Sequence, residues 1–181
     1  LLQEQGKPMI VHPNDHVNHS QSSNDIFPTA LHVVGVLLIT RHLFPALDTL
    51  HQTLQEHSET FRNVVKIGRT HLMDATPLTL GQEISGWDRM ITRNKEMLTS
   101  GIDFLRELGM GGTAVGTGIN CPAGFDGKVA AEISRLTGET FHTAPNKFHS
   151  LASKDELVVV HGMLKALARD LMEIAKDNRG P

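Results

Sequence analysis

The feature that most constrains the fold is a stripe of apolar side chains spaced alternately three and four residues apart. Its members are Leu80, Ile84, Trp87, Ile91, Leu98, Ile102 and Leu105. This spacing places side chains on one face of an α-helix, and it predicts a long helix after Pro77. Thr79 and Gln82 have the spacing of a capping box, which predicts the first turn, and Asn94 is a polar gap in the stripe. A helix this long needs other helices to cover its apolar face.

Other parts of the chain carry the same periodicity. The expected helices are a run that begins near Ser23 or Asn24 and is kinked or divided at Pro45, a run over residues 126–136 that ends at Gly138, and a run from Ser153 to Asn178. Residues 31–39 are apolar on nearly every side, which favours burial among several helices. No segment alternates with period two for long enough to predict a sheet. The sequence therefore predicts an all-α fold of long, roughly antiparallel helices in a bundle.

Composition limits the classes of protein to which the chain can belong. It has 181 residues and a net charge of −3, with no basic block, so neither nucleic acid nor an anionic membrane is an expected partner. The longest apolar run, residues 30–40, is too short to cross a bilayer. The single cysteine, Cys121, cannot form a disulfide within the chain and points to a reducing compartment.

Two polar clusters stand at expected helix boundaries. Residues 12–25 are almost all polar and directly precede an apolar run, and they end with Ser22, Ser23 and Asn24 at a helix N-terminus. Unpaired N–H groups and the positive end of the helix dipole favour an anion at such a place. Thr70 and His71 lie in the connection before the next helix. If the two clusters converge, at the end of the bundle or between chains, they could hold a small carboxylate, with His71 moving a proton.

Three other interpretations compete with a carboxylate site. The first cluster could be a solvated loop with a helix cap. Its His12, Asp15, His16 and His19 could bind a metal, although zinc needs three or four ligands that converge at about 2 Å on a rigid scaffold. Residues 109–114 fit the loose glycine pattern of a dinucleotide site, but no strand precedes them and no helix follows. We reject the dinucleotide site and expect these glycines to let the backbone pass close to a helix or a ligand.

Several blocks of the sequence together resemble one known family. These blocks are residues 12–15, 20–30, 66–83, 111–120 and 146–148. They are similar to class II fumarases of the fumarase/aspartase superfamily, and the likeness covers essentially the whole chain in order. Aspartate ammonia-lyases of this superfamily usually carry Gln where this chain has His71. The resemblance therefore favours a fumarase, with an aspartate ammonia-lyase or a non-catalytic helical oligomerisation module as alternatives.

The resemblance implies a reaction and a set of site residues. Class II fumarases, enzymes of the tricarboxylic acid cycle, add water reversibly to fumarate to give L-malate through a carbanion, with no cofactor and no metal. By resemblance, Ser22, Ser23 and Asn24 would hold substrate carboxylate groups, Thr70 would contribute a hydroxyl, and His71 would orient or protonate the leaving water. His12, Pro13, Asn14 and Asp15 match the second dicarboxylate site of the family. Met9 replaces a basic residue that is frequent there, with Lys7 as the nearest cation, which predicts a weakened second site.

The resemblance also implies an assembly and a place in a longer chain. Family members form a homotetramer in which each active site draws loops from three chains, in the cytoplasm or, in eukaryotes, the mitochondrial matrix. Their serine-bearing catalytic loop lies beyond the position of Pro181, and a segment precedes Leu1. Residues 1–181 are therefore expected to be the central helical domain, truncated at both ends. We expect this chain alone to show negligible fumarate formation from malate in an absorbance assay; turnover near that of a full-length enzyme would contradict this.

Overall fold

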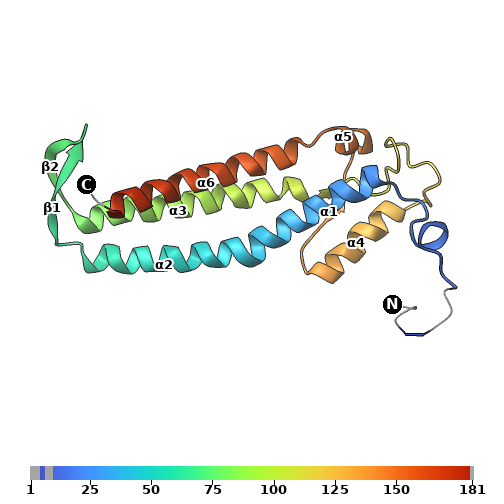
Figure 1. Ribbon diagram of the computed structural model, residues 1–181, viewed down its shortest axis with the longest axis horizontal. Coiled ribbons are helices and arrows are strands. Elements are labelled where there is room, and N and C mark those ends of the chain that lie inside the picture. Colours follow the sequence, from blue (N-terminus) through green and yellow to red (C-terminus); the bar gives the residue numbers. More distant parts are fainter. Residues whose placement is uncertain (1–4, 7–9, 180–181) are drawn as a thin grey trace. The chain divides into compact units, whose positions relative to one another are not determined.

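The structure is a computed structural model, and it describes residues 5–6 and 10–179 (Figure 1). Its α-helices are α1 (Ser23–Leu38), α2 (Phe44–Thr60), α3 (Leu80–Ile102), α4 (Phe125–Thr137), α5 (Lys147–Ala152) and α6 (Asp155–Arg179). Shorter helical turns are η1 (Pro13–Val17), η2 (Ile39–Leu43) and η3 (Phe104–Arg106). The strands are β1 (Val65–Thr70), β2 (Met73–Thr79), β3 (Glu107–Leu108) and β4 (His142–Thr143). Long helices dominate, which confirms the predicted all-α class.

The chain divides into two compact units. The first unit comprises Leu1–Val34 and Leu105–Lys154, and the second comprises Gly35–Phe104 and Asp155–Pro181. Helix α1 begins in the first unit and ends in the second. Each unit has its own buried apolar residues, so each is described by itself.

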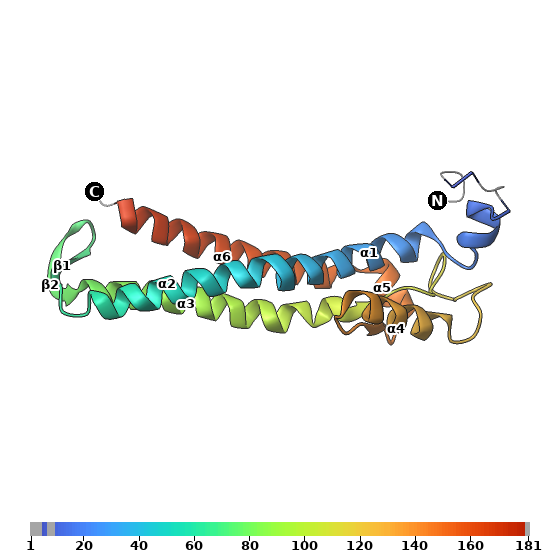
Figure 2. The ribbon, with the colours of Figure 1, turned by 90° about the horizontal axis from the view of Figure 1, so that it is seen from below.

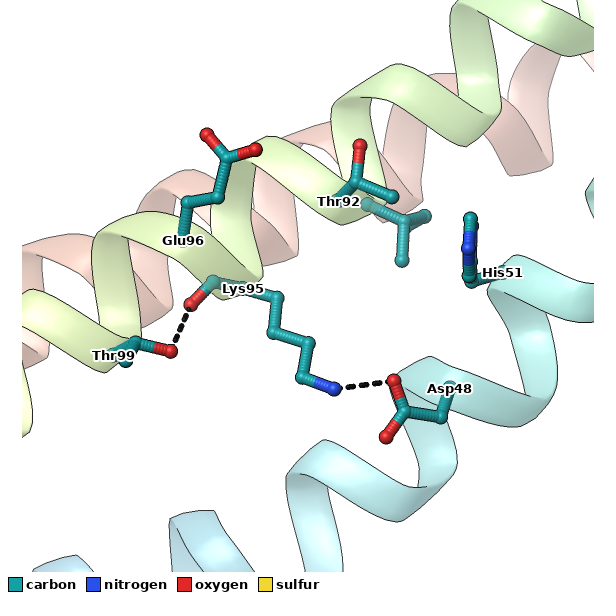
Figure 3. A pocket seen from close by; sticks show the side chains of 7 residues that line it. Asp48, His51, Thr92, Lys95, Glu96 and Thr99 are labelled. Atoms are coloured by element: carbon teal, nitrogen blue, oxygen red, sulfur yellow. Dashed lines mark hydrogen bonds and ion pairs between the residues drawn. The ribbon is translucent and has the colours of Figure 1, made fainter.

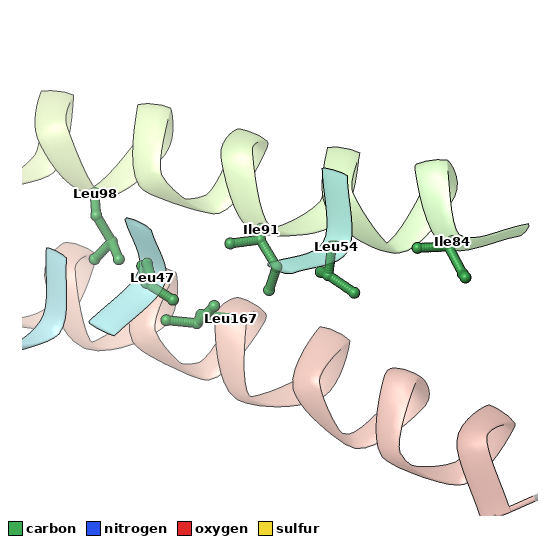
Figure 4. Packing of buried hydrophobic residues seen from close by; sticks show 6 residues of the cluster. All are labelled: Leu47, Leu54, Ile84, Ile91, Leu98 and Leu167. Atoms are coloured by element: carbon green, nitrogen blue, oxygen red, sulfur yellow. The ribbon is translucent and has the colours of Figure 1, made fainter. Parts of the chain in front are cut away.

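The second unit contains α2, α3 and α6, which lie side by side, with α3 antiparallel to the other two (Figures 1 and 2). Their shared core consists of Leu47, Leu54, Ile84, Ile91, Leu98 and Leu167 (Figure 4). Three of these residues belong to the apolar stripe predicted for α3, and Leu98 is fully buried. The stripe therefore does what its spacing predicts: it packs one face of α3 against two other helices.

Helix α3 begins with the predicted capping box. The Thr79 hydroxyl accepts a hydrogen bond from the Gln82 backbone N–H at 3.1 Å, and the Gln82 side-chain oxygen accepts one from the Thr79 N–H at 2.9 Å. Gly81 follows at once, and a Cβ there would lie 2.4 Å from the Ser58 carbonyl oxygen. The absence of a side chain at Gly81 allows the start of α3 to lie directly against the end of α2.

Asn94, the polar residue that interrupts the stripe, forms a hydrogen bond between helices. Asn94 is 1% exposed, and its Nδ2 donates to Asp170 Oδ2 on α6 at 2.6 Å and to the Met90 carbonyl at 2.8 Å. Because burying an amide without partners costs free energy, this position needs the carboxylate on the facing helix. The gap is thus a specific contact between α3 and α6.

A shallow hollow of about 320 Å³ lies between α2 and α3 (Figure 3). Lys95 extends across it from α3 and forms an ion pair with Asp48 of α2. At its rim, His51 Nδ1 lies 2.5 Å from Asp88 Oδ1. The His51 side chain is 31% exposed, and α3 supplies this carboxylate. These polar contacts join the two helices outside their apolar core.

The interruption predicted at Pro45 takes the form of a wide helical turn, η2, which lies between α1 and α2 and ends two residues before Pro45. The backbone stays helical through Leu43 and Phe44, so the helix is not broken there. The helical stretch Ser23–Thr60 is long and apolar enough to cross a membrane by length and composition, as core helices of soluble proteins also are. The absence of a membrane partner stays a prediction.

The prediction of no sheet was wrong for the connection between α2 and α3. Strands β1 and β2 form an antiparallel hairpin in which Val65 pairs with Thr79 and Thr70 with Met73, with an irregularity at Gly68. Most residues of both strands are exposed, on both faces. A period-two pattern arises only when one face is buried, so the sequence carried no signal for these strands.

The first unit is built around short elements. Strands β3 and β4 pair in parallel, with Glu107 opposite His142 and Leu108 opposite Thr143. Helix α4 ends at Gly138 as predicted, and the φ of 71° at Gly138 is the left-handed conformation common at helix C-termini. Between β3 and α4, residues 109–120 form an irregular loop, which we call the glycine-rich loop. It crosses the N-terminus of α1.

Candidate functional site

The first predicted polar cluster lies at the N-terminus of α1, as expected. The Ser22 hydroxyl accepts a hydrogen bond from the Asn24 N–H at 3.2 Å, and the Ser22 carbonyl accepts one from the Ile26 N–H at 3.0 Å. Ser22 therefore occupies the N-cap position, which serine favours. Ser23 and Asn24 are exposed in the first turn. This end of α1 combines hydroxyl and amide groups with the positive end of the helix dipole.

The glycine-rich loop accepts hydrogen bonds from two side chains of this segment. Asn24 Nδ2 donates to the Ala114 carbonyl at 2.8 Å, and Ser20 Oγ donates to the Asn120 carbonyl at 2.6 Å. A Cβ at Gly116 would lie 3.0 Å from the backbone nitrogen of Phe148 in α5, so the loop also passes close to that helix. The expectation that these glycines allow a close backbone approach is confirmed for helices of this unit.

A shallow depression of about 380 Å³ lies where α1, the loop and the end of α5 meet. It is lined by Ser23, Asn24, Phe27, Pro28, Ala114, Leu151 and Lys154. The Lys154 ammonium donates to the carbonyls of Ser150 and Leu151, in the last turn of α5, at 2.9 and 3.1 Å, and to the Ser153 carbonyl at 2.7 Å. Sequence reasoning did not select Lys154, although a lysine just after a helix end is a common partner for the last carbonyls. The depression thus combines a helix N-terminus with one cationic side chain.

Behind the loop lies a polar network that sequence reasoning also missed. Lys147 donates to the Leu108 carbonyl at 2.9 Å and to the Thr143 hydroxyl, which in turn donates to Asp126 Oδ2 at 2.7 Å. The Thr143 hydrogen bond lowers the pKa of the Asp126 carboxyl, and burial lowers the pKa of the Lys147 ammonium. Burial also raises the pKa of the Cys121 thiol, which agrees with a structural cysteine rather than a nucleophile.

The second predicted cluster lies at the tip of the β1–β2 hairpin. Thr70 pairs with Met73, so His71 and Leu72 form a two-residue turn, with φ of 53° and 60°. Two central residues with positive φ are typical of a type I′ turn, which favours Asn-Gly over larger residues. Thr70 and His71 are exposed, and Leu72 is 100% exposed. The turn therefore presents the His71 imidazole to solvent at the cost of backbone strain.

This strain gives a testable prediction. Leu72→Gly is expected to raise the free energy of unfolding by about 1 kcal/mol, because glycine adopts positive φ without the steric penalty of a branched side chain. Chemical denaturation followed by circular dichroism would measure the change. Met73→Gly is the matched control, because Met73 lies in β2 without positive φ and should lose stability on the same substitution. A loss of stability in both variants would contradict the strained turn.

The two clusters belong to different units of the chain. Ser22, Ser23 and Asn24 lie in the first unit, and Thr70 and His71 lie in the second. Each cluster has the local geometry expected of it, a helix N-terminus and an exposed connection. That they converge on one ligand stays a prediction.

The segment matched to a second dicarboxylate site forms the helical turn η1. His12 precedes the turn, and its Nδ1 accepts a hydrogen bond from the Asp15 N–H at 3.2 Å and lies 3.1 Å from Asp15 Oδ2. His16 Nδ1 accepts from the His12 N–H at 2.8 Å. Because both Nδ1 atoms are engaged within the turn, they are poorly available to the metal considered above. Pro13 opens the turn, while Met9, Lys7 and the Asn14 side chain lie outside the described residues.

The helical architecture is that of a known class of enzymes. A protein-family model described as "Lyase" matches residues 2–180, and the chain belongs to this lyase family. Within it, the chain is 58% identical over 179 residues to the class II fumarate hydratase of Bacillus subtilis, covering 99% of this chain and 39% of that relative.

Solved structures agree with this assignment. A class II fumarase from Schistosoma mansoni superposes with a TM-score of 0.91 at 38% identity, over 93% of this chain and 38% of that one. A fumarate lyase:delta crystallin from Brucella melitensis superposes with a TM-score of 0.92 at 34% identity, over 98% of this chain and 39% of that one. The chain thus spans about two fifths of the length of the relatives that it matches.

Proposed function

We propose that this chain supplies part of the active site of a class II fumarate hydratase, which adds water reversibly to fumarate to give L-malate. The observation that supports this best is the N-terminus of α1, where Ser23 and Asn24 line a depression beside the glycine-rich loop. Asn24 uses one amide proton for Ala114, which leaves the second for a ligand. A carboxylate there would meet hydroxyl groups, an amide donor and a helix dipole.

In this proposal the N-terminus of α1 binds the negatively charged carboxylate groups, and the His71 imidazole transfers protons. Removing a proton from malate next to a carboxylate places negative charge on that carboxylate, and donors fixed by the fold stabilise it. Ser22, Ser23 and Asn24 would hold the carboxylate groups, with the Thr70 hydroxyl as a further contact. His71 would orient or protonate the water that leaves, because imidazole exchanges protons near neutral pH. We propose no cofactor and no metal for this reaction.

The substrate is tested in a protein of the relatives' full length that contains this sequence. Malate and aspartate are supplied in parallel, and fumarate formation is followed by absorbance. Fumarate from malate alone supports the hydratase. Fumarate from aspartate alone would replace it with an ammonia-lyase. If neither substrate reacts and no dicarboxylate binds on titration, the alternative that stands is a non-catalytic helical oligomerisation module.

Asn24 gives a prediction about binding. Asn24→Asp is expected to raise the KM for malate at least about tenfold, because a carboxylate would replace a donor and repel the substrate's own carboxylate. Steady-state kinetics at several malate concentrations measure this. Asn178→Asp makes the same chemical change at an exposed position of α6 and should leave KM unchanged. Equal KM values for the Asn24 variant and the parent would remove Asn24 from the site.

We propose that the protein assembles as a homotetramer. The supporting observation is an exposed seam on α1, spaced four, three and four residues apart, which is the spacing of a coiled-coil interface. Its members are Phe27, Leu31, Val34 and Leu38. Apolar side chains in such a row usually mark a protein interface. Light scattering of the protein, with Val34→Glu as the disrupting variant, tests this; a monomeric parent protein would contradict it.

We also propose a second dicarboxylate site at His12, Pro13, Asn14 and Asp15. The exposed His12 imidazole at the start of η1 supports it, because a protonated histidine can pair with a carboxylate. Fumarate titration followed through the His12 ring signals tests it, and no shift in those signals would remove the site.

For the compartment, we propose the cytoplasm, or the mitochondrial matrix in a eukaryote. The single cysteine supports it, because Cys121 has no partner for a disulfide within the chain. Cell fractionation tests this, and recovery of the protein outside the cell would contradict it.

A further inference from the structure

Asp25 is a buried carboxylate that joins two segments far apart in the sequence. Its side chain is fully buried in the first turn of α1. Oδ1 accepts a hydrogen bond from the Ser22 N–H at 3.0 Å. Oδ2 accepts two from the glycine-rich loop, from the Gly111 N–H at 3.2 Å and the Thr113 N–H at 2.8 Å. A buried carboxylate is stable only when such donors replace water, so these bonds are required in the folded state.

The loop backbone that donates to Asp25 is strained. Gly111 has a φ of 90° and Thr113 a φ of 57°. Positive φ at a β-branched residue costs of order 1–3 kcal/mol and persists only where the surroundings impose it. The Thr113 hydroxyl is buried and has no hydrogen-bond partner among the described residues, so the side chain does not compensate for the strain. The backbone N–H groups do, because this conformation turns both of them toward one carboxylate oxygen, as in an anion-binding nest.

The strained segment leads directly into the depression. Ala114, the next residue, accepts the Asn24 amide and lines the depression. Asp25 follows Asn24 in the chain and also fixes the backbone of Ser22. The Asp25 carboxylate therefore fixes the backbone close to Asn24, at Ser22, and the backbone close to Ala114, at Gly111 and Thr113.

We propose that Asp25 is a positioning residue: its carboxylate occupies the nest of the glycine-rich loop and thereby fixes the Asn24 amide at the depression. What the depression binds rests on the function proposed above. The carboxylate itself touches no ligand in this arrangement. Its charge and both its oxygens are needed, because an asparagine offers only one acceptor oxygen and would leave at least one buried N–H without a partner.

The test compares Asp25→Asn with Asp48→Asn in a protein of the relatives' full length. Asp48 makes an exposed ion pair in the second unit, so its substitution removes the same charge away from the loop. We expect Asp25→Asn to speed amide exchange at least about tenfold at one or more of Ser22, Gly111 and Thr113, the effect of losing one buried hydrogen bond. We also expect the KM for malate to rise about tenfold, with kcat changed less than about threefold, because binding geometry is lost rather than proton transfer. Asp48→Asn should change none of these values.

A second substitution separates positioning from loss of folding. Thr113→Gly removes the steric penalty of positive φ, so the double variant Asp25→Asn/Thr113→Gly should recover part of the KM even if the single variant folds poorly. Unchanged exchange at Ser22, Gly111 and Thr113 in Asp25→Asn would overturn the proposal, and so would faster exchange with an unchanged KM. Exchange is measured without substrate. A protein that lacks hydratase activity but shows the faster exchange would therefore defeat the proposed function while leaving the contact between Asp25 and the loop in place.

Discussion

His71→Asn is expected to lower the rate of fumarate hydration by about 100-fold or more, the scale for loss of a general acid–base group. Asparagine keeps a polar side chain of similar size but cannot exchange a proton near neutral pH. His71 lies exposed in the two-residue turn of its hairpin. The measurement is kcat for malate dehydration in a protein of the relatives' full length.

The control for this prediction is another exposed histidine. His42 lies in η2, and its replacement by Asn should leave kcat within about twofold. Circular dichroism should be unchanged in both variants, because an exposed turn contributes little to the core. An unchanged kcat for His71→Asn would remove the imidazole from the mechanism and weaken the proposal that the hairpin tip meets the N-terminus of α1.

Leu98→Ala is expected to lower the free energy of unfolding by about 3 kcal/mol. The side chain is fully buried between α2, α3 and α6, so truncation loses its burial and leaves a cavity that long packed helices can only partly close. Urea denaturation followed by circular dichroism measures the loss. For a domain of ordinary stability this is a large fraction of the total.

Leu136→Ala is the matched substitution at an exposed site. Leu136 is 68% exposed near the end of α4, so the same truncation should cost less than about 1 kcal/mol. Equal losses at positions 98 and 136 would mean that the three-helix core does not determine the stability of the second unit.

Apolar spacing predicted the fold where helices pack on helices. The stripe of α3, the capping box at Thr79 and the end of α4 at Gly138 were all predicted correctly. The β1–β2 hairpin was missed because its strands have no buried face and its turn carries His71 and Leu72 instead of Asn-Gly. A regular spacing of apolar residues arises only where one face of an element is buried, and the exposed hairpin has no such face.

At the N-terminus of α1, sequence patterns identified the groups at the helix end and missed the buried carboxylate behind them. Ser22 and Asn24 were selected because their types favour helix ends, and they lie at one. Asp25 was placed in the first turn but not recognised as buried, because an aspartate there ordinarily faces solvent and interacts with the helix dipole. Its partners lie 86 and 88 residues away, and local sequence patterns do not encode such pairings.

The contact between Asn94 and Asp170 has a consequence for how α3 and α6 can align. A shift of one helix along the other by a single turn, about 5.4 Å, would separate these two side chains. The buried Asn94 amide would then lose its carboxylate partner, which costs free energy. The contact between Asn94 and Asp170 therefore fixes how α3 and α6 align along their axes.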